Sequence, residues 1–217
     1  MDAAPRKPVP VFPLPGVVLF PHAELGLHVF ELRYRTMVRD ALSGERLIAL
    51  ATLEPGWERD YHGSPAFHSL GCVARFEEVV WLPNDRYDLR VRGAVRVRFG
   101  KQAREFPYRA CHVELDPEAP YTESDPLAQI ALQGLLEERS RLAPLGSEIW
   151  LAPPALEGSE PLATVTAVLA TTLRLPADVK LALLAEDDVP ERARQLRERM
   201  RRMGPAATPG PPTVSPN

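Results

Sequence analysis

A single change of hydrophobic period, inside the segment from Val9 to Leu42, constrains the fold of this chain more than any other feature. Leu25, Leu27 and Val29 occupy alternate positions, and this period of two predicts a strand. Directly afterwards apolar residues recur at helical spacing, at Phe30, Tyr34, Met37, Val38, Ala41 and Leu42. Prolines at positions 10, 13, 15 and 21 remove ladder donors, so the preceding segments are predicted to be edge strands or extended arms.

The middle of the chain carries further strand patterns. A continuous apolar run at Leu47–Leu53 predicts a strand buried on both faces. Two longer segments, Leu70–Leu82 and Arg86–Phe99, are joined by Pro-Asn-Asp, a composition typical of a hairpin turn. In the second segment a break at positions 93 and 94 is expected to bend the strand without reversing its alternation. The arginines at positions 90, 92, 96 and 98 are therefore predicted to share one face.

Beyond residue 115 the chain changes character. The acidic segment 116–125 contains prolines and is predicted to be a linker. Ser124 or Asp125 can cap a helix that has Pro126 at its first position. Helical periodicity then continues towards residue 203, interrupted by an irregular loop from 144 to 161. Residues 204–217 are low in complexity and are predicted to form a disordered tail.

Composition narrows the class of protein. A formal net charge of -3 and a pI near 6.0 argue against a dedicated nucleic-acid binder. No apolar segment reaches the ~18 residues that span a bilayer, and the first residues lack the apolar core of a signal peptide. Cys72 and Cys111 are the two cysteines, and both are predicted to be buried, reduced thiols. We therefore expect a cytoplasmic protein with no membrane partner.

The opening run PVFPLPGVVLFPH, followed by LHVFELRYRTMVRDAL, resembles the start of the Lon protease amino-terminal (substrate-binding) domain. The motif residues there are Phe30, Glu31, Arg33 and Tyr34. The resemblance continues at Gly71, Val73, Val91, Gly93 and Arg96, and then at Pro176, Lys180, Leu183, Leu184, Asp188, Val189 and Arg192. It implies an α+β fold, in which a PUA-like twisted β-subdomain with one amphipathic helix, over 8–118, precedes an all-helical subdomain over 124–203.

Motifs of catalytic chemistry are missing from the sequence. None of the three lysines precedes a hydroxyl residue, as the phosphate-binding loop of an ATPase requires. No motif supports the serine–lysine pair of a Lon-type peptidase, and neither H-E-x-x-H nor Cys-x-x-Cys occurs. His62 and His68 form only a weak pair of metal ligands across a loop. We therefore predict that the chain is not an enzyme and has no cofactor or metal site.

The resemblance implies a non-catalytic protein-binding module that recognises exposed apolar segments of unfolded or partner proteins. Such clients would be held in shallow apolar grooves between the two subdomains. A separate Lon-type protease is the other partner that we consider. The candidate contacts are Val18, Phe20, Phe30, Glu31, Arg33, Tyr34, Trp57 and Trp81. Each apolar candidate could equally belong to the core, and the Glu–Arg–Tyr motif could equally clamp the helix to the sheet.

The predicted arginine face leaves a second hypothesis open. PUA-like folds elsewhere bind RNA, and a row of arginines could follow its phosphate backbone. The alternative is a solvated sheet face whose arginines pair with nearby glutamates. The residues concerned are Arg90, Arg92, Arg96 and Arg98, with Glu77, Glu78 and Glu105 as the pairing carboxylates. A small-ligand pocket ranks last, because the aromatic cage of ligand-binding relatives lies in a separate domain.

Overall fold

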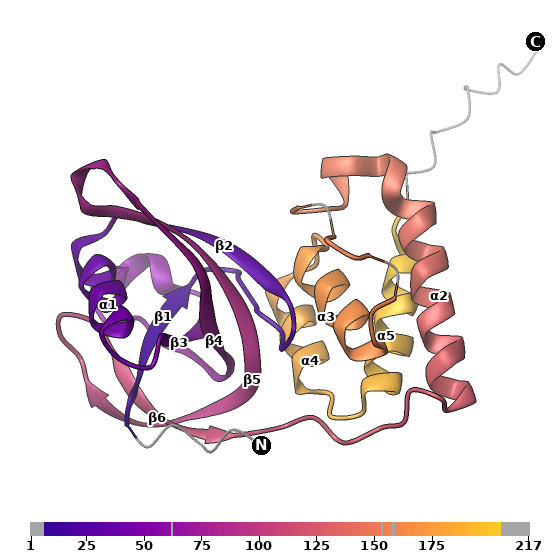
Figure 1. Ribbon diagram of the computed structural model, residues 1–217, viewed down its shortest axis with the longest axis horizontal. Helices are drawn as coiled ribbons and strands as arrows, with labels where there is room; N and C mark the ends of the chain where they lie inside the picture. Colours follow the sequence, from indigo (N-terminus) through magenta and orange to yellow (C-terminus); the bar gives the residue numbers. More distant parts are fainter. Residues whose placement is uncertain (1–6, 62, 153, 158, 205–217) are drawn as a thin grey trace, which may run out of the picture.

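The computed structural model describes residues 7–61, 63–152, 154–157 and 159–204. Its strands are β1 (Val9–Leu14), β2 (Glu24–Val29), β3 (Leu47–Leu53), β4 (Phe67–Leu82), β5 (Arg86–Arg104) and β6 (Ala110–Leu115). Its α-helices are α1 (Leu32–Leu42), α2 (Pro126–Leu142), α3 (Leu162–Thr172), α4 (Ala177–Ala185) and α5 (Val189–Arg202). Short 3-10 turns are η1 (Trp57–Asp60), η2 (Pro83–Asp85) and η3 (Ala143–Glu148). Figure 1 shows the strands with α1 on one side and α2–α5 on the other, which confirms the predicted α+β fold.

The strands β5, β4, β3, β1 and β6 close into a ring, because β6 pairs with β1 and also with β5. The long strand β5 has two partners in succession along one side. Its first part pairs with β2, from Arg92↔Glu24 to Tyr87↔Val29, and its later part pairs with β6. A small apolar cluster that includes Val73 and Val97 fills the inside of the ring. β2 stands outside the ring and pairs with β5 alone in the described part of the chain.

The proline-bearing strand β1 lies between β3 and β6, so the prediction that it is an edge strand is wrong. Its residues change partner along the strand: Val9 and Pro10 pair with β6, whereas Val11 to Leu14 pair with β3. Pro10 has its register partner in β6 and Pro13 has its partner in β3, so each proline pairs on one side and needs no N–H group towards the other. Proline is therefore tolerated at an internal position of this sheet.

A β-bulge at Ala94 reverses the alternation of β5, contrary to the prediction. Position 73 pairs with 95 and position 74 with 93, which leaves Ala94 as the extra residue. Before the bulge Val91 faces the core outside the ring, and after it Val97 lines the inside. The arginines on the two sides of the bulge therefore point to opposite faces of the sheet.

Gly93, next to this bulge, is required by the close approach of the turn that precedes β2. A Cβ atom at Gly93 would lie 2.1 Å from the carbonyl oxygen of Phe20. The amide of His22 donates to Gly93 O at 2.8 Å, and Gly93 N donates to Ala23 O at 2.9 Å. His22 has a positive φ of 71°. The turn therefore lies over β5 and fixes the start of β2.

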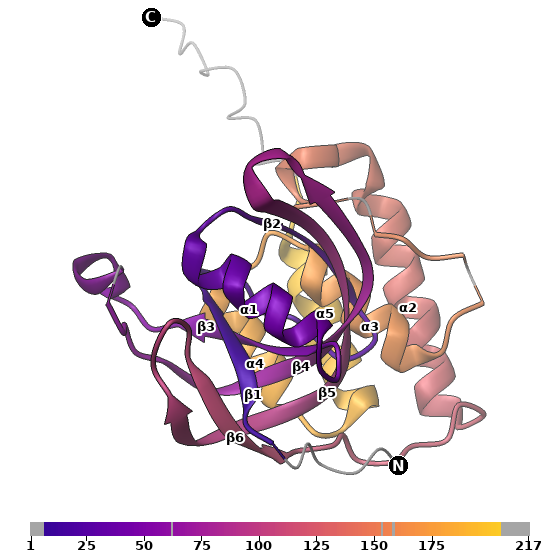
Figure 2. The same cartoon turned by 60° about the vertical axis from the view of Figure 1, so that its left-hand side comes forward.

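The largest group of buried residues lies outside the ring and joins the two halves of the molecule. The helix α1 lies over β1 and β3 (Figure 2) and buries Tyr34, Met37 and Val38 there. The same cluster includes Leu135 of α2 and Leu196 of α5. The strand ring and the helices thus share one core, and their division into subdomains at 8–118 and 124–203 stays a prediction.

The helical periodicity predicted towards residue 203 is confirmed, and beyond the loop it forms α3, α4 and α5. The predicted disordered tail, 204–217, lies outside the described residues except for Gly204. Within the described ranges, each helix is too short or too polar to cross a membrane.

The amino end of α2 decides between the two predicted capping residues. Asp125 Oδ1 accepts a hydrogen bond from Leu127 N at 2.7 Å. Asp125→Ala is expected to lower the free energy of unfolding by about 1 kcal/mol, because this amide loses its acceptor. Ser124→Ala, at an exposed neighbouring position, is the matched control and should change it by less than ~0.5 kcal/mol. Urea unfolding measures both, and equal losses would contradict the assignment of the cap.

Candidate functional site

A groove of about 600 Å³ lies between the strand ring and the helical part. Its walls are His22, Glu24 and Arg92 from the strand side, Thr164, Val168 and Thr172 from α3, and Ala152, Ala155, Leu156, Glu157 and Glu160 from the segment before α3. The three α3 residues are four positions apart and form one stripe along the helix. The α3 wall of the groove thus presents methyl and hydroxyl groups, and we call its charged lining residues, Glu24, Arg92, Glu157 and Glu160, the rim.

Carboxylates dominate the rim. Glu24 forms an ion pair with Arg92, and Arg90 lies 3.9 Å from the same carboxylate. Arg92 also lies 3.7 Å from Glu77, so its charge is shared between two carboxylates. Because Glu157 and Glu160 line the opposite side, the groove has an excess of negative charge.

Sequence reasoning missed the α3 wall of this groove. The predicted helical periodicity covers α3, and most of the residues of this helix are buried. Thr164 and Thr172 interrupt the apolar pattern on the same stripe as Val168, and both are half-buried. A polar stripe on an otherwise buried helix was the available signal that this side of α3 meets solvent.

Several predicted contact residues belong to the core instead. Val18 is 3 % exposed and Phe20 is 0 % exposed, and both pack in the cluster outside the ring. Tyr34 is also buried, with its ring 4.5 Å from that of Phe12. Val18 and Phe20 therefore offer almost no surface to a partner of the folded protein, and Tyr34 offers little. The apolar run around Val18 resembles a surface arm in sequence, but here it forms the turn that covers β5.

The remaining aromatic candidates lie at the surface or near it. Phe30 follows β2, is 60 % exposed and stacks on His28 with ring centroids 5.9 Å apart. Trp81, near the end of β4, is 70 % exposed. Trp57 is half-buried and contacts the ring of Tyr61 at 5.4 Å. Phe30 follows the end of β2 that is farther from the groove. None of these three aromatic residues belongs to the groove lining.

The Glu–Arg–Tyr motif forms a clamp between the start of α1 and the segment near residue 61. Arg33 Nε donates to Glu31 Oε2 at 3.0 Å, and Tyr61 Oη donates to Glu31 Oε1 at 2.7 Å. Arg33 Nη2 donates to Tyr61 O at 3.0 Å, and its guanidinium lies 4.6 Å from the centre of the Tyr34 ring. The carboxylate of Glu31 and the guanidinium of Arg33 thus both have partners within the protein. This favours the interpretation that the motif clamps the helix to the sheet over the interpretation that it binds a partner.

The clamp has a spectroscopic signature in Tyr61. The hydrogen bond to the Glu31 carboxylate is the main cause that raises the pKa of Tyr61 to about 12. Glu31→Gln removes the negative charge, so the pKa of Tyr61 is expected to fall towards 10. Ultraviolet titration of tyrosinate measures it, and Tyr61→Phe identifies the contribution of this ring by difference. Identical titrations of Glu31→Gln and the unsubstituted protein would contradict the clamp.

The predicted arginine face does not exist as one surface. Arg96 is 1 % exposed and is held by Asp116 and Asp187, on the helical side of the sheet. Arg98 lies 3.1 Å from Asp116, on the same side. Arg90 lies on the other side of the bulge, 3.1 Å from Glu78, and Arg92 is near it. Paired arginines on two different faces offer no continuous path for a phosphate backbone.

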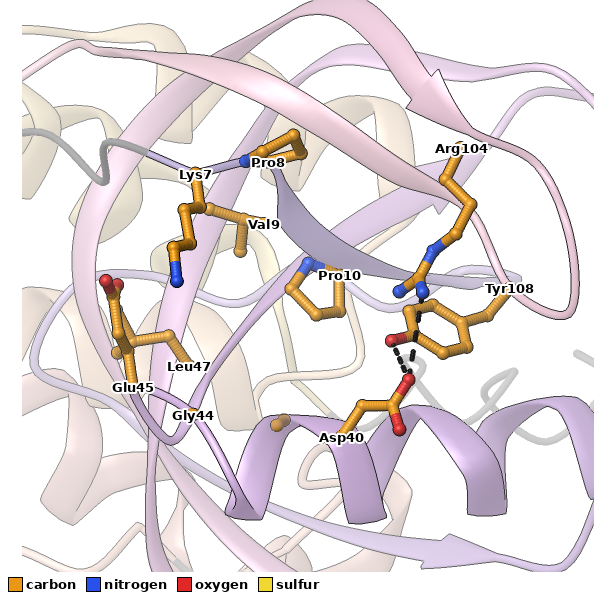
Figure 3. A pocket seen from close by; sticks show the side chains of 11 residues that line it. Lys7, Pro8, Val9, Pro10, Asp40, Gly44, Glu45, Leu47, Arg104 and Tyr108 are labelled. Carbon is orange, nitrogen blue, oxygen red and sulfur yellow. Dashed lines mark hydrogen bonds and ion pairs between the residues drawn. The ribbon is translucent and has the colours of Figure 1, made fainter.

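A second, smaller cavity of about 200 Å³ lies beside the start of β1 (Figure 3). Tyr108 Oη donates to Asp40 Oδ2 at 2.5 Å, and the Arg104 guanidinium lies 3.8 Å from the centre of the Tyr108 ring. Burial is the main cause that raises the pKa of Tyr108 to about 12. The polar groups of Asp40, Arg104 and Tyr108 are thus occupied by one another. We interpret these contacts as a structural link between α1 and the β5–β6 connection, not as a binding site.

Metal ligands do not gather anywhere in the described ranges, where no group of three His, Cys, Asp or Glu side chains could hold an ion. His62, one of the two weak candidates, lies outside the described residues.

Comparison with known proteins identifies the family. The model of the ATP-dependent protease La (LON) substrate-binding domain matches residues 8–202. Lon protease 2 of Herpetosiphon aurantiacus is 27 % identical over 200 residues, which cover 90 % of this chain and 24 % of that protein. The chain spans about a quarter or less of the curated Lon proteases that it matches.

Solved structures agree. The crystal structure of a Lon N-terminal domain protein from Xanthomonas campestris has a TM-score of 0.62 at 27 % identity, covering 88 % of this chain and 96 % of that chain. The N-terminal domain of a Mycobacterium avium complex Lon protease has the same fold, with a TM-score of 0.64 at 18 % identity and coverages of 90 % and 98 %. Because the family model covers most of the sequence, the chain belongs to the Lon substrate-binding domain family.

Proposed function

We propose that the chain binds unfolded or partly unfolded polypeptides and performs no chemical step itself. The groove between the strand ring and α3 is the observation that carries this proposal, because it is open, partly apolar and about 600 Å³ in volume. Such a volume lies within the range of protein ligand sites and can receive a few side chains of an extended polypeptide. Membership of a substrate-binding domain family supports the same role.

The chemistry of the groove lining supports a binding role without catalysis. Glu24 and Arg92 form an ion pair, so neither is a free acid or base. The hydroxyl of Thr172 donates to Val168 O at 2.7 Å, which leaves it poorly placed to act as a nucleophile. The lining residues that the structure describes thus offer contacts and charge.

RNA binding, the alternative hypothesis, has less support. Its four candidate arginines are divided between two faces, and each has a carboxylate partner. A protein that binds through phosphate contacts needs exposed cations free to release counterions. The net charge of -3 also argues against RNA binding, because it repels a phosphate backbone.

Binding of a permanently unfolded protein tests the proposal. Reduced and carbamidomethylated lysozyme is expected to bind the chain, whereas native lysozyme is not, in fluorescence anisotropy titrations. Thr164→Arg places a long side chain in the groove and should weaken binding about fivefold or more. Ser140→Arg, at an exposed position of α2 outside the groove, is the matched control. Equal affinity of both variants, or no binding of the unfolded protein, would refute the proposal.

The proposed setting is the cytoplasm, with a separate Lon-type protease as a second partner. Cys72 and Cys111 are free thiols, the state that reducing compartments maintain. A binding module of this family would present its clients to such a protease. Faster degradation of an unfolded client by purified Lon protease when the chain is added would support this partnership, and an unchanged rate would refute it.

A further inference from the structure

We infer that a client polypeptide is held as an added β-strand on the free edge of β2, and that the preferred segment alternates apolar residues with arginine or lysine. This inference rests on the proposed function and specifies how the client is recognised. It combines four observations: an open strand edge, its continuity with the groove, the charge on one face of β2 and the apolar side chains on the other face.

The edge of β2 is open. Among the described strands, β2 is the one that has a single neighbour along its whole length. In an antiparallel pair, alternate residues direct their N–H and C=O groups away from the partner strand. Gly26 and His28 are exposed, and a Cβ atom on Gly26 would meet no heavy atom within 4 Å beyond its chain neighbours. Unpaired edges of this kind are templates for strand addition.

The later half of β4 provides a contrast within the same sheet. The register between β3 and β4 reaches Arg75, and Phe76 N donates to Arg46 O at 3.1 Å. From Glu77 onwards β4 has no strand on that side in the described part of the chain. That stretch contains a register shift between Phe76 and Glu78 and two adjacent carboxylates. Bulges and charges are the usual devices that block pairing at a strand edge. β2 has the sequence ELGLHV, with no register shift, proline or lysine.

The edge of β2 leads into the groove. Glu24, the first residue of β2, lines the groove opposite α3, and Figure 1 shows this end of β2 beside α3. At the other end Phe30 offers an exposed ring. The six residues of β2 span about 20 Å, since an antiparallel strand rises ~3.4 Å per residue. A client strand laid along β2 would therefore gain backbone hydrogen bonds at the edge and deliver its next side chains into the groove.

The charge beside β2 selects basic side chains on one face of the client. The carboxylates beside β2 are Glu24 and Glu160, which are half-buried, and the exposed Glu77, Glu78, Asp88 and Glu157. The exposed arginines on this surface are Arg75, Arg90 and Arg92. His28 pairs with Asp88 at 2.6 Å. Because carboxylates outnumber guanidinium groups, a basic residue on an adjacent strand gains an opposite-charge neighbour and an acidic one is repelled.

The other face of β2 selects apolar side chains. Leu25 and Leu27 point to that face, are half-buried and pack against the core outside the ring. Alternate residues of an added strand would lie beside them and extend this apolar surface. The two faces together therefore favour a client segment in which apolar and basic residues alternate.

Backbone methylation of the client tests strand addition without changing the protein. The probe is a labelled peptide of about ten residues in which valine and arginine alternate, titrated against the full chain. Two further versions carry N-methyl groups either on every arginine nitrogen or on every valine nitrogen. Only one set of N–H groups faces β2 in an added strand, so one version should bind about tenfold or more weakly while the other keeps its affinity.

Charge is tested separately. A peptide in which glutamate replaces arginine should bind about tenfold or more weakly, and the affinity of the arginine peptide should fall with added salt. Glu157→Lys should weaken the arginine peptide about threefold. Glu58→Lys, at an exposed position of η1 outside the groove, should leave its affinity unchanged.

The outcomes distinguish this inference from the proposed function. Equal loss, or no loss, for the two methylated peptides would reject strand addition, even if unfolded lysozyme still binds. Failure of unfolded lysozyme to bind would reject the proposed function itself. A dimer in analytical ultracentrifugation that the arginine peptide does not dissociate would show that a second copy of this chain occupies the edge, and would also overturn the inference.

Discussion

Replacing Arg96 with methionine is expected to lower the free energy of unfolding by about 3 kcal/mol, because two carbonyl oxygens that accept from its buried guanidinium lose their donor. The side chain is buried and donates to Asp116 O at 2.9 Å and to Leu184 O at 2.7 Å. It also forms ion pairs with the carboxylates of Asp116 and Asp187. One guanidinium therefore ties β5 to the segment after β6 and to the turn between α4 and α5.

Arg98→Met is the matched control for this prediction. Arg98 lies two residues further along β5 and pairs with the same aspartate at 3.1 Å, but its side chain is largely exposed. Exposed ion pairs contribute little, so this variant should lose less than about 1 kcal/mol. Urea unfolding followed by circular dichroism measures both variants. Similar losses would show that burial of Arg96 does not link the two halves of the molecule.

The local elements could be predicted because their signals are local. The change of period after Val29 depends on side-chain spacing alone, and β2 does end there, with α1 starting at Leu32. The amino end of α2 follows from one capping carboxylate and one proline. Neither feature depends on what another part of the chain does.

The faces of β5 could not be predicted, because a bulge is defined by two strands together. Gly93 and Ala94 indicate a disturbance, but only the register against β4 shows that Ala94 is the unpaired residue. One extra residue moves every later side chain to the other face of the sheet. That single step moves Arg96 from a predicted solvent face into an interface with the helices.

The groove escaped prediction for a similar reason. Its walls come from the turn before β2, from β5 and from α3, which are far apart in sequence. The resemblance supplied the expectation of a groove between subdomains but not the residues that line it. Val18 and Phe20, which the sequence offered as contacts, instead bury themselves on the way to β2. An apolar side chain can be buried in the core or exposed to bind a partner, and the sequence does not distinguish the two. The packing of the folded chain shows that these two residues are buried.

The stability of the protein is expected to rise with pH, relative to the variant Lys180→Met, by about 3 kcal/mol between pH 8 and 10.5. Lys180 is buried on α4, and its ammonium donates to Thr171 O at 2.7 Å. Burial lowers the pKa of Lys180 from 10.5 to about 8. In this window the unfolded chain still binds the proton that the folded protein has released. Raising the pH therefore favours the folded state, and methionine has no proton to release.

The comparison must be a difference between two proteins, because other buried groups act in the opposite direction. Burial raises the pKa of the Cys72 thiol from 9.0 to about 12, so the folded protein keeps a proton that the unfolded chain loses. Cys72 alone would thus make stability fall above pH 9.0. Cys72 lies on β4 and Lys180 on α4, so the thiol contributes equally to both proteins and cancels when their unfolding curves are subtracted. A difference that stays flat from pH 8 to 10.5 would mean that the Lys180 amine has the same pKa in the folded and unfolded states, and the argument from burial would fail.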